Sequence, residues 1–77
     1  MPSTVISRIL YESEARVLSV WFRESGELYR YYDVPPRVND AFRRAASKGR
    51  FFNAYIKDRY AFQRIEHAPD DDGRHAA

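Results

Sequence analysis

Apolar and polar residues alternate along the first half of the chain in a way that favours β-strands. Residues 5–12 mix β-branched and aromatic side chains, and residues 16–23 carry apolar side chains at every second position. A third run, residues 28–34, is rich in tyrosine and ends at Pro35 and Pro36. Proline ends a strand because it has no N–H to donate and restricts the residue before it. The pattern predicts a three-stranded antiparallel meander.

Two tight turns are expected to set the pairing of these strands. Residues 13–14 would form the first turn and residues 25–26 the second, since Gly26 tolerates a positive φ. The expected cross-strand pairs are Phe22 with Tyr29, Val20 with Tyr31 and Leu18 with Ile9. Both turns then place one set of residues on the same face, which we expect to face the core. This set is Ile9, Leu18, Val20, Phe22, Tyr29 and Tyr31.

The opposite face of the predicted sheet combines apolar residues with arginines. It holds Ile6, Arg8, Leu10, Val17, Ser19, Trp21, Arg23, Leu28, Arg30 and Tyr32. In this register the guanidinium of Arg30 would stack over the indole of Trp21. Three interpretations stay open: an ordinary solvated face, a surface for a protein partner or a second copy, or a platform for unpaired bases. The residues that a partner would contact are Arg8, Leu10, Trp21, Arg30 and Tyr32.

The second half of the chain shows helical spacing. Pro36 suits a first helical turn, and apolar residues follow at positions 38, 41, 42 and 45. Ser47 is a good N-cap for a second helix that ends at residue 57 or 58. We expect this helix to bury Phe51, Phe52, Tyr55 and Ile56. Residues 60–65 form either a short fourth strand or an extended cover, so the predicted fold is α+β, a meander packed on one face by two helices.

Length and composition point to one small domain without cross-links. The chain has 77 residues, no cysteine and 16% aromatic residues, which supply a dense core. It shows no signal peptide and no apolar run long enough to span a membrane, so we expect a cytoplasmic protein. Residues 1–65 are expected to form the domain and residues 66–77 a disordered acidic tail.

Several short motifs, taken in order, resemble the KTSC domain. They are Tyr29-Arg30-Tyr31, Val34-Pro35, Ser47-Lys48-Gly49-Arg50-Phe51-Phe52-Asn53, Ile56-Lys57 and Tyr60. The resemblance covers roughly residues 5–65. It implies a domain that occurs at the C-terminus of some lysyl-tRNA synthetases and as a stand-alone bacterial protein, with RNA binding suggested and no catalytic residue. Tyr29 and Tyr31 match its central motif, yet the predicted register makes them core residues rather than ligand contacts.

Positive charge is concentrated in the second half, where residues 37–65 carry eight Lys or Arg against two Asp. Such a surface attracts polyanions, and the start of the second helix, Ser47 to Arg50, offers free N–H groups to a phosphate. The same segment is also explained by Ser47 capping the helix and Gly49 allowing two helices to approach closely. The candidate RNA-binding residues are Arg37, Arg43, Arg44, Ser47, Lys48, Gly49, Arg50, Lys57 and Arg59.

The chain contains no residue set typical of an enzyme. It shows no Ser/His/Asp arrangement, no carboxylate pair and no Gly-rich phosphate loop, and no cofactor, metal or small-molecule substrate is indicated. The leading hypothesis is a non-catalytic module that binds tRNA or another structured RNA through its basic helical surface. The alternative is a protein-interaction or homodimerisation module that uses the outer sheet face around Trp21.

Overall fold

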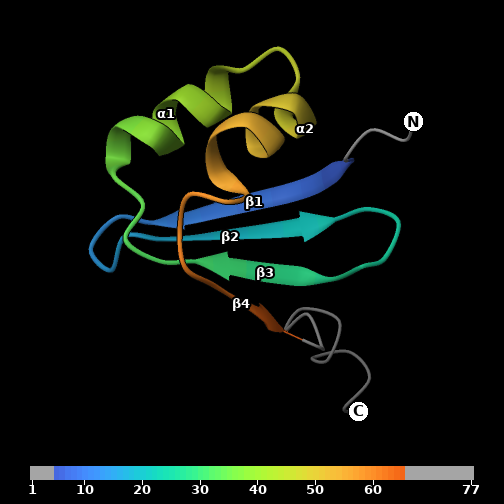
Figure 1. Cartoon of the computed structure of the whole chain (residues 1–77), viewed down its shortest axis with the longest axis horizontal. Coiled ribbons are helices and arrows are strands. Elements are labelled where there is room, and N and C mark those ends of the chain that lie inside the picture. Colours follow the sequence, from blue (N-terminus) through green and yellow to red (C-terminus); the bar gives the residue numbers. More distant parts are fainter. Residues whose placement is uncertain (1–4, 66–77) are drawn as a thin grey trace.

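The computed structural model describes residues 5–65, which form one antiparallel sheet with helices on one side (Figure 1). The strands lie side by side in sequence order: β1 (Ile6–Glu12), β2 (Val17–Phe22), β3 (Leu28–Tyr31) and β4 (Phe62–Ile65). Between β3 and β4 the chain forms α1 (Pro36–Arg44), α2 (Lys48–Phe51) and the π-helical segment η1 (Phe52–Ile56). The α+β prediction is confirmed, and the short fourth strand is present. The predicted acidic tail lies outside the described residues.

The strand register differs from the prediction by two residues at both turns. Tyr29 faces Val20 instead of Phe22, Tyr31 faces Leu18 instead of Val20, and Ile9 faces Val20 instead of Leu18. The reason is that both connections are longer than two residues. Four residues, 13–16, join β1 to β2, and five, 23–27, join β2 to β3. Because a two-residue displacement leaves a side chain on its face, most predicted faces are right although the predicted pairs are wrong. Ile6, which we expected on the outer face, is an exception: a bulge between Ile6 and Arg8 places it opposite Phe22. Ile6 therefore packs against the core cluster.

Two residues with positive φ close these longer connections. Gly26 has a φ of 71°, and its N–H donates to the carbonyl of Phe22. Arg16 has a φ of 58° just before β2. Left-handed backbone is easy for glycine and costly for arginine, so the expectation about Gly26 holds while Arg16 was not anticipated.

The predicted core face does carry the core, although unevenly. Leu18, Val20 and Tyr31 are at most 2% exposed, and they pack with buried residues from the helices and the β3–α1 connection: Val34, Phe42, Phe52 and Ile56. Tyr29 and Phe22 are only half-buried. Tyr11 of β1 also packs against this cluster, and its hydroxyl donates to the carbonyl of Val34 over 2.6 Å. The core is therefore formed by the centre of β2, Tyr31 of β3 and the helices, and Phe22 and Tyr29 lie at its margin.

The second helix departs from regular α geometry, and this corrects one expectation. The N–H of Lys57 donates to the carbonyl of Phe52 over 2.9 Å, a bond one residue longer than in an α-helix. Phe52 and Ile56 face the core, whereas Tyr55, which we expected to be buried, is 55% exposed. The extra residue in the turn brings Ile56 inward, and Tyr55 then lies outside the core.

None of the helices within residues 5–65 has the length and apolar character needed to cross a membrane.

Candidate functional site

The predicted RNA-binding residues lie on the helices, and the structure groups only some of them. All are exposed except Lys48, which is half-buried, and Gly49, which is buried. Arg37 from α1 and Arg59, just beyond η1, line one hollow of about 410 Å³ together with Val38, Ala41, Phe51, Tyr55 and Tyr60. We call this hollow the basic groove. Lys57 does not reach it and lines a different hollow.

Aromatic side chains form part of the basic groove. The rings of Phe51 and Tyr55 are 4.8 Å apart, one helical turn from each other, and Phe51 also stacks on Phe42 of α1 at 5.5 Å. Phe51 is thus anchored in the helix packing, while Tyr55 lies at the surface. An exposed ring beside two guanidinium groups is able to stack on a base while the guanidinium groups contact phosphates.

The groups expected to hold a phosphate at the start of α2 are engaged within the chain. The N–H of Arg50 donates to Ser47 Oγ over 3.3 Å, as the N-cap prediction requires. Lys48 Nζ donates to the carbonyl of Ala45 over 2.9 Å, at the end of α1. The first contact caps α2, as the capping interpretation requires, and the second joins α2 to the end of α1. Arg43 and Arg44 occupy the last turn of α1, where a cation is favourable to the helix dipole.

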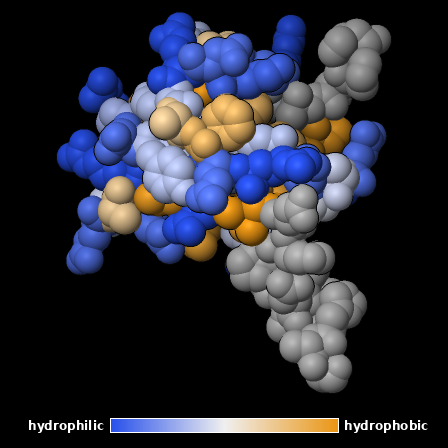
Figure 2. Space-filling view, turned by 60° about the horizontal axis from the view of Figure 1, so that its bottom comes forward, coloured by the Kyte–Doolittle hydropathy of each residue, from blue (hydrophilic) through white to orange (hydrophobic). Residues whose placement is uncertain are grey.

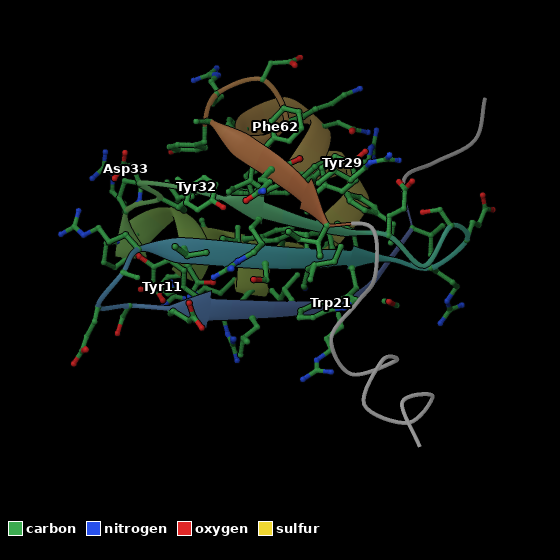
Figure 3. All side chains as sticks on the ribbon, turned by 90° about the horizontal axis from the view of Figure 1, so that it is seen from below. Tyr11, Trp21, Tyr29, Tyr32, Asp33 and Phe62 are labelled. Atoms are coloured by element: carbon green, nitrogen blue, oxygen red, sulfur yellow. The ribbon has the colours of Figure 1, made fainter. Side chains whose placement is uncertain are left out.

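The outer sheet face is more closed than the sequence suggests (Figure 3). Val17 and Leu28 on this face are 6% and 3% exposed, whereas Leu10 is 43% exposed. Figure 2 shows limited apolar surface among hydrophilic residues on the side of the molecule that lies at the bottom of Figure 1. Of these three apolar side chains on the outer face, Leu10 alone is therefore exposed to a partner.

The charged and polar residues of the outer face contact one another. The guanidinium of Arg8, not that of Arg30, lies over the Trp21 ring, 4.8 Å from its centroid. The predicted stacking is wrong because the two-residue displacement puts Arg8 opposite Trp21 on β1. Arg30 instead faces Ser19 and lies 3.6 Å from Glu12 Oε1, while the Tyr32 hydroxyl donates to Gln63 Oε1 over 3.0 Å.

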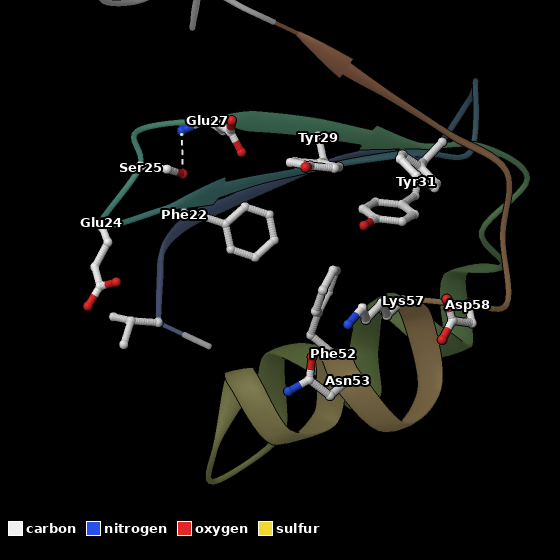
Figure 4. A pocket seen from close by; sticks show the side chains of 12 residues that line it. Phe22, Glu24, Ser25, Glu27, Tyr29, Tyr31, Phe52, Asn53, Lys57 and Asp58 are labelled. Carbon is white, nitrogen blue, oxygen red and sulfur yellow. Dashed lines mark hydrogen bonds between the residues drawn. The ribbon is translucent and has the colours of Figure 1, made fainter. Parts of the chain in front are cut away.

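A second hollow, which the sequence analysis did not predict, opens where the inner sheet face leaves the cover of the helices (Figure 4). Its volume is about 440 Å³. Five aromatic residues line it: Phe22, Tyr29, Tyr31, Phe52 and Phe62. Its polar lining residues are Glu24, Ser25, Glu27, Asn53, Lys57 and Asp58. We call it the aromatic cleft.

The rings of the aromatic cleft form a connected set. Phe22 meets Tyr29 and Phe52 edge to face, each at 5.3 Å, and Tyr31 meets Phe52 at 5.5 Å. Phe62 on β4 lies 5.5 Å from both tyrosine rings and is 53% exposed. Edge-to-face contacts of this kind stabilise the cluster beyond its buried area. The cleft wall is thus part of the core on one side and open to solvent on the other.

Tyr31 connects the core with this cleft. Burial raises the pKa of its phenol, and the neighbouring Tyr29 and the carboxylate of Asp58 raise it further. Tyr31 is a core residue, as predicted, yet both motif tyrosines also line the cleft, with Tyr29 the more exposed of the two.

One sequence signal for the aromatic cleft existed. If residues 60–65 form a strand beside β3, Phe62 falls next to Tyr31, as it does in the structure. The charged residues of the cleft come from the loop before β3 and from the end of η1, and no periodicity links these two segments.

Comparison with known proteins matches residues 2–60 to the sequence profile of the KTSC domain. The chain belongs to the KTSC domain family. The crystal structure of a KTSC domain protein from Yersinia pestis superimposes with a TM-score of 0.76 at 40% identity, covering 84% of this chain and 90% of that one. The resemblance stated from the motifs is confirmed.

KTSC relatives occur in two settings. An uncharacterised protein of Stutzerimonas stutzeri is 40% identical over 67 residues, which cover 86% of this chain and 93% of that protein. A lysine–tRNA ligase of Nostoc punctiforme is 37% identical over 62 residues, which cover 80% of this chain. The match spans only 11% of that ligase. The KTSC profile includes every residue of the basic groove, and β4 with Phe62 lies beyond its end.

Proposed function

We propose that this KTSC domain is a non-catalytic RNA-binding module that uses the basic groove. The observation that carries the proposal is the position of Arg37 and Arg59. They are far apart in the sequence, yet they line one hollow that also contains the exposed ring of Tyr55. Two guanidinium groups suit phosphates, and the ring suits an unpaired base.

The setting of the relatives supports RNA as the partner. The lysine–tRNA ligases that match this chain act on tRNA, as their name states, and they contain the KTSC segment as a small part of their length. A small basic module within such an enzyme would add affinity for the tRNA backbone. We extend this role to the present chain, with tRNA or another structured RNA as the ligand.

Binding of this kind would be mainly electrostatic. Each phosphate that a cation neutralises releases counterions, so affinity falls as the salt concentration rises. Stacking of a base on Tyr55 would add about 1–3 kcal/mol that depends less on salt. Arg43, Arg44 and Arg50 would extend the contact along the helices, and Lys57 would take part only if the RNA also reached the aromatic cleft.

A tRNA titration tests the proposal. We expect saturable binding, followed by fluorescence anisotropy of labelled tRNA, that is much weaker at about 200 mM salt than at about 50 mM. The double variant Arg37→Ala/Arg59→Ala should lower the affinity at least about tenfold and reduce the salt slope by about 1 for each arginine. Arg23→Ala is the matched control, because Arg23 is exposed in the loop after β2 and lies outside the groove. Absence of binding at low salt, or equal losses for control and groove variants, would overturn the proposal.

Homodimerisation through the outer sheet face stays a prediction with less support. Arg8, Arg30 and Tyr32 contact groups of their own chain, which leaves Leu10 as the main exposed apolar residue of that face. A mass measurement in solution at high protein concentration checks it, and a strict monomer would exclude this form of assembly.

A further inference from the structure

The aromatic cleft has the construction of a ligand site rather than of a packing defect. Four of its rings contact one another, and two of them, Tyr31 and Phe52, are at most 3% exposed, so the wall is rigid. Phe62 closes one side and keeps half of its surface in water. An apolar ring exposed at the rim of a hollow is typical of a surface that a ligand covers.

The helical segment on the other side of the cleft has uncommon geometry. The π-helical turn of η1 places Phe52 in the wall, and Asn53 and Lys57 also line the cleft. Such turns are rare and occur often at functional sites, because they redirect side chains that a regular helix would place elsewhere. The sheet and the helical segment thus both contribute side chains to the same hollow.

Charge decides which kind of ligand suits this cleft. Its lining contains three carboxylates, those of Glu24, Glu27 and Asp58, and a single ammonium, that of Lys57. Glu27 is paired with Arg64 at 2.6 Å. Within residues 5–65, neither Glu24 nor Asp58 forms an ion pair. A phosphate would meet repulsion at these carboxylates, whereas a cation would be attracted to them.

Aromatic faces reinforce this preference. The negative face of a ring attracts ammonium and guanidinium groups, by about 0.5–2 kcal/mol depending on how dry the site is. Tyr29 and Phe62 line the cleft, Phe62 is 53% exposed, and Asp58 lines the same cleft. Rings and carboxylate therefore surround the same space.

We propose that the aromatic cleft binds an organic cation, an ammonium or guanidinium group whose charge lies near Asp58 and whose carbon atoms pack on Tyr29 and Phe62. The cation comes from one of two sources, a free amine or the basic side chain of a peptide. This site is separate from the basic groove and does not depend on RNA binding.

Titration of the isotope-labelled chain with defined cations tests the proposal. The probes are trimethyl-lysine, arginine amide and spermidine as free cations, a short lysine-containing peptide, and adenosine monophosphate as an aromatic anion. We expect the cations to shift the amide signals of cleft residues in a saturable way, more strongly at low salt than at high salt. If the peptide binds at least about tenfold more tightly than the free cations, the source is a basic side chain; the reverse order identifies a free amine.

Two conservative variants test the chemistry without disturbing the core. Asp58→Asn removes the charge at nearly constant size, and Phe62→Leu removes the ring while keeping an apolar side chain; both residues are exposed. Each should weaken cation binding at least about fivefold. Glu14→Gln, in the exposed β1–β2 connection, is the matched control and should bind as the unchanged chain does. Three outcomes would overturn the proposal. The cleft could bind the anion more strongly than any cation, no cation could bind, or Asp58→Asn, Phe62→Leu and Glu14→Gln could all bind the cations with equal affinity.

Discussion

The basic groove and the aromatic cleft lie on two faces of one helical segment. Both contain aromatic residues, but the charged residues of the groove are arginines, whereas those of the cleft are mostly carboxylates. In the groove the exposed ring, Tyr55, stands beside two arginines. In the cleft the rings stand beside carboxylates, and Tyr31 and Phe52 belong to the core. The comparison shows that one helical segment presents an aromatic residue with arginines on one side and aromatic residues with carboxylates on the other.

The two hollows should differ most in what their aromatic residues contribute to stability. Phe52→Ala removes a buried ring and should cost about 3–5 kcal/mol, a large part of the stability of a domain of this size. Tyr55→Ala removes an exposed ring and should cost less than about 1 kcal/mol. Urea unfolding followed by Trp21 fluorescence measures both. Similar losses would mean that Tyr55 is buried and that the groove is differently built.

Variants in one hollow should weaken the binding of its own ligand and leave the binding of the other hollow's ligand unchanged. Arg37→Ala/Arg59→Ala should weaken tRNA binding at least about tenfold and leave the cation affinity of the cleft unchanged. Asp58→Asn should do the reverse, lowering cation affinity at least about fivefold without weakening tRNA binding. Anisotropy and amide shifts measure the two affinities on the same protein samples. If one variant weakens both, the two hollows belong to one continuous site.

The buried phenol of Tyr31 makes the stability of the domain depend on pH. Because its pKa is raised on folding, the unfolded chain loses this proton near pH 10 while the folded chain keeps it. The contribution of the protonated Tyr31 phenol to stability is therefore fully present below about pH 10, and the free energy of unfolding falls as the pH rises above that value. Urea unfolding at about pH 8 and about pH 11 should show a smaller fall for Tyr31→Phe than for the unchanged chain. An equal fall would show that the phenol is not perturbed by burial.

The smallest expected change in stability and binding comes from a substitution at Ser47, the N-cap of α2. Ser47→Ala removes the acceptor of the Arg50 N–H and should cost about 1 kcal/mol. Because Lys48 still contacts the end of α1, the helices should keep their arrangement and tRNA binding should change little. Ser47→Asp, which restores an acceptor, is the control for stability. A large loss of tRNA affinity in Ser47→Ala would instead support the phosphate site first expected there.

Much of the fold was predictable from the sequence, because the face of the sheet on which a side chain lies is easier to predict than its partner on the neighbouring strand. Both connections proved longer than a two-residue turn, and the even displacement of the register preserved the set around Leu18, Val20 and Tyr31. The helices followed from Pro36 and Ser47. The position of Tyr55 was missed, because a 3.6-residue period does not reveal a π-helical turn.

The candidate sites were less predictable than the fold. The basic surface was visible as charge along the chain, but its concentration around Arg37 and Arg59 depends on how α1 meets the end of η1. The aromatic cleft depends on the pairing of β4 with β3 and on a loop and a helix end that approach each other only in the folded chain. Tyr31 is a core residue and Tyr29 is half-buried beside the core, and both also line the cleft.

The fourth strand closes the longest loop in the sheet, since both helices intervene between it and β3. We expect this edge strand to detach more easily than the others, because its side chains are mostly exposed and its pairing closes a long loop. Its amide hydrogens should therefore exchange with solvent faster than those of β2, which is paired on both sides. Since Phe62 leaves together with β4, the aromatic cleft would be opened by this local detachment while the rest of the core stays folded, and a ligand held there would slow the exchange of β4 first.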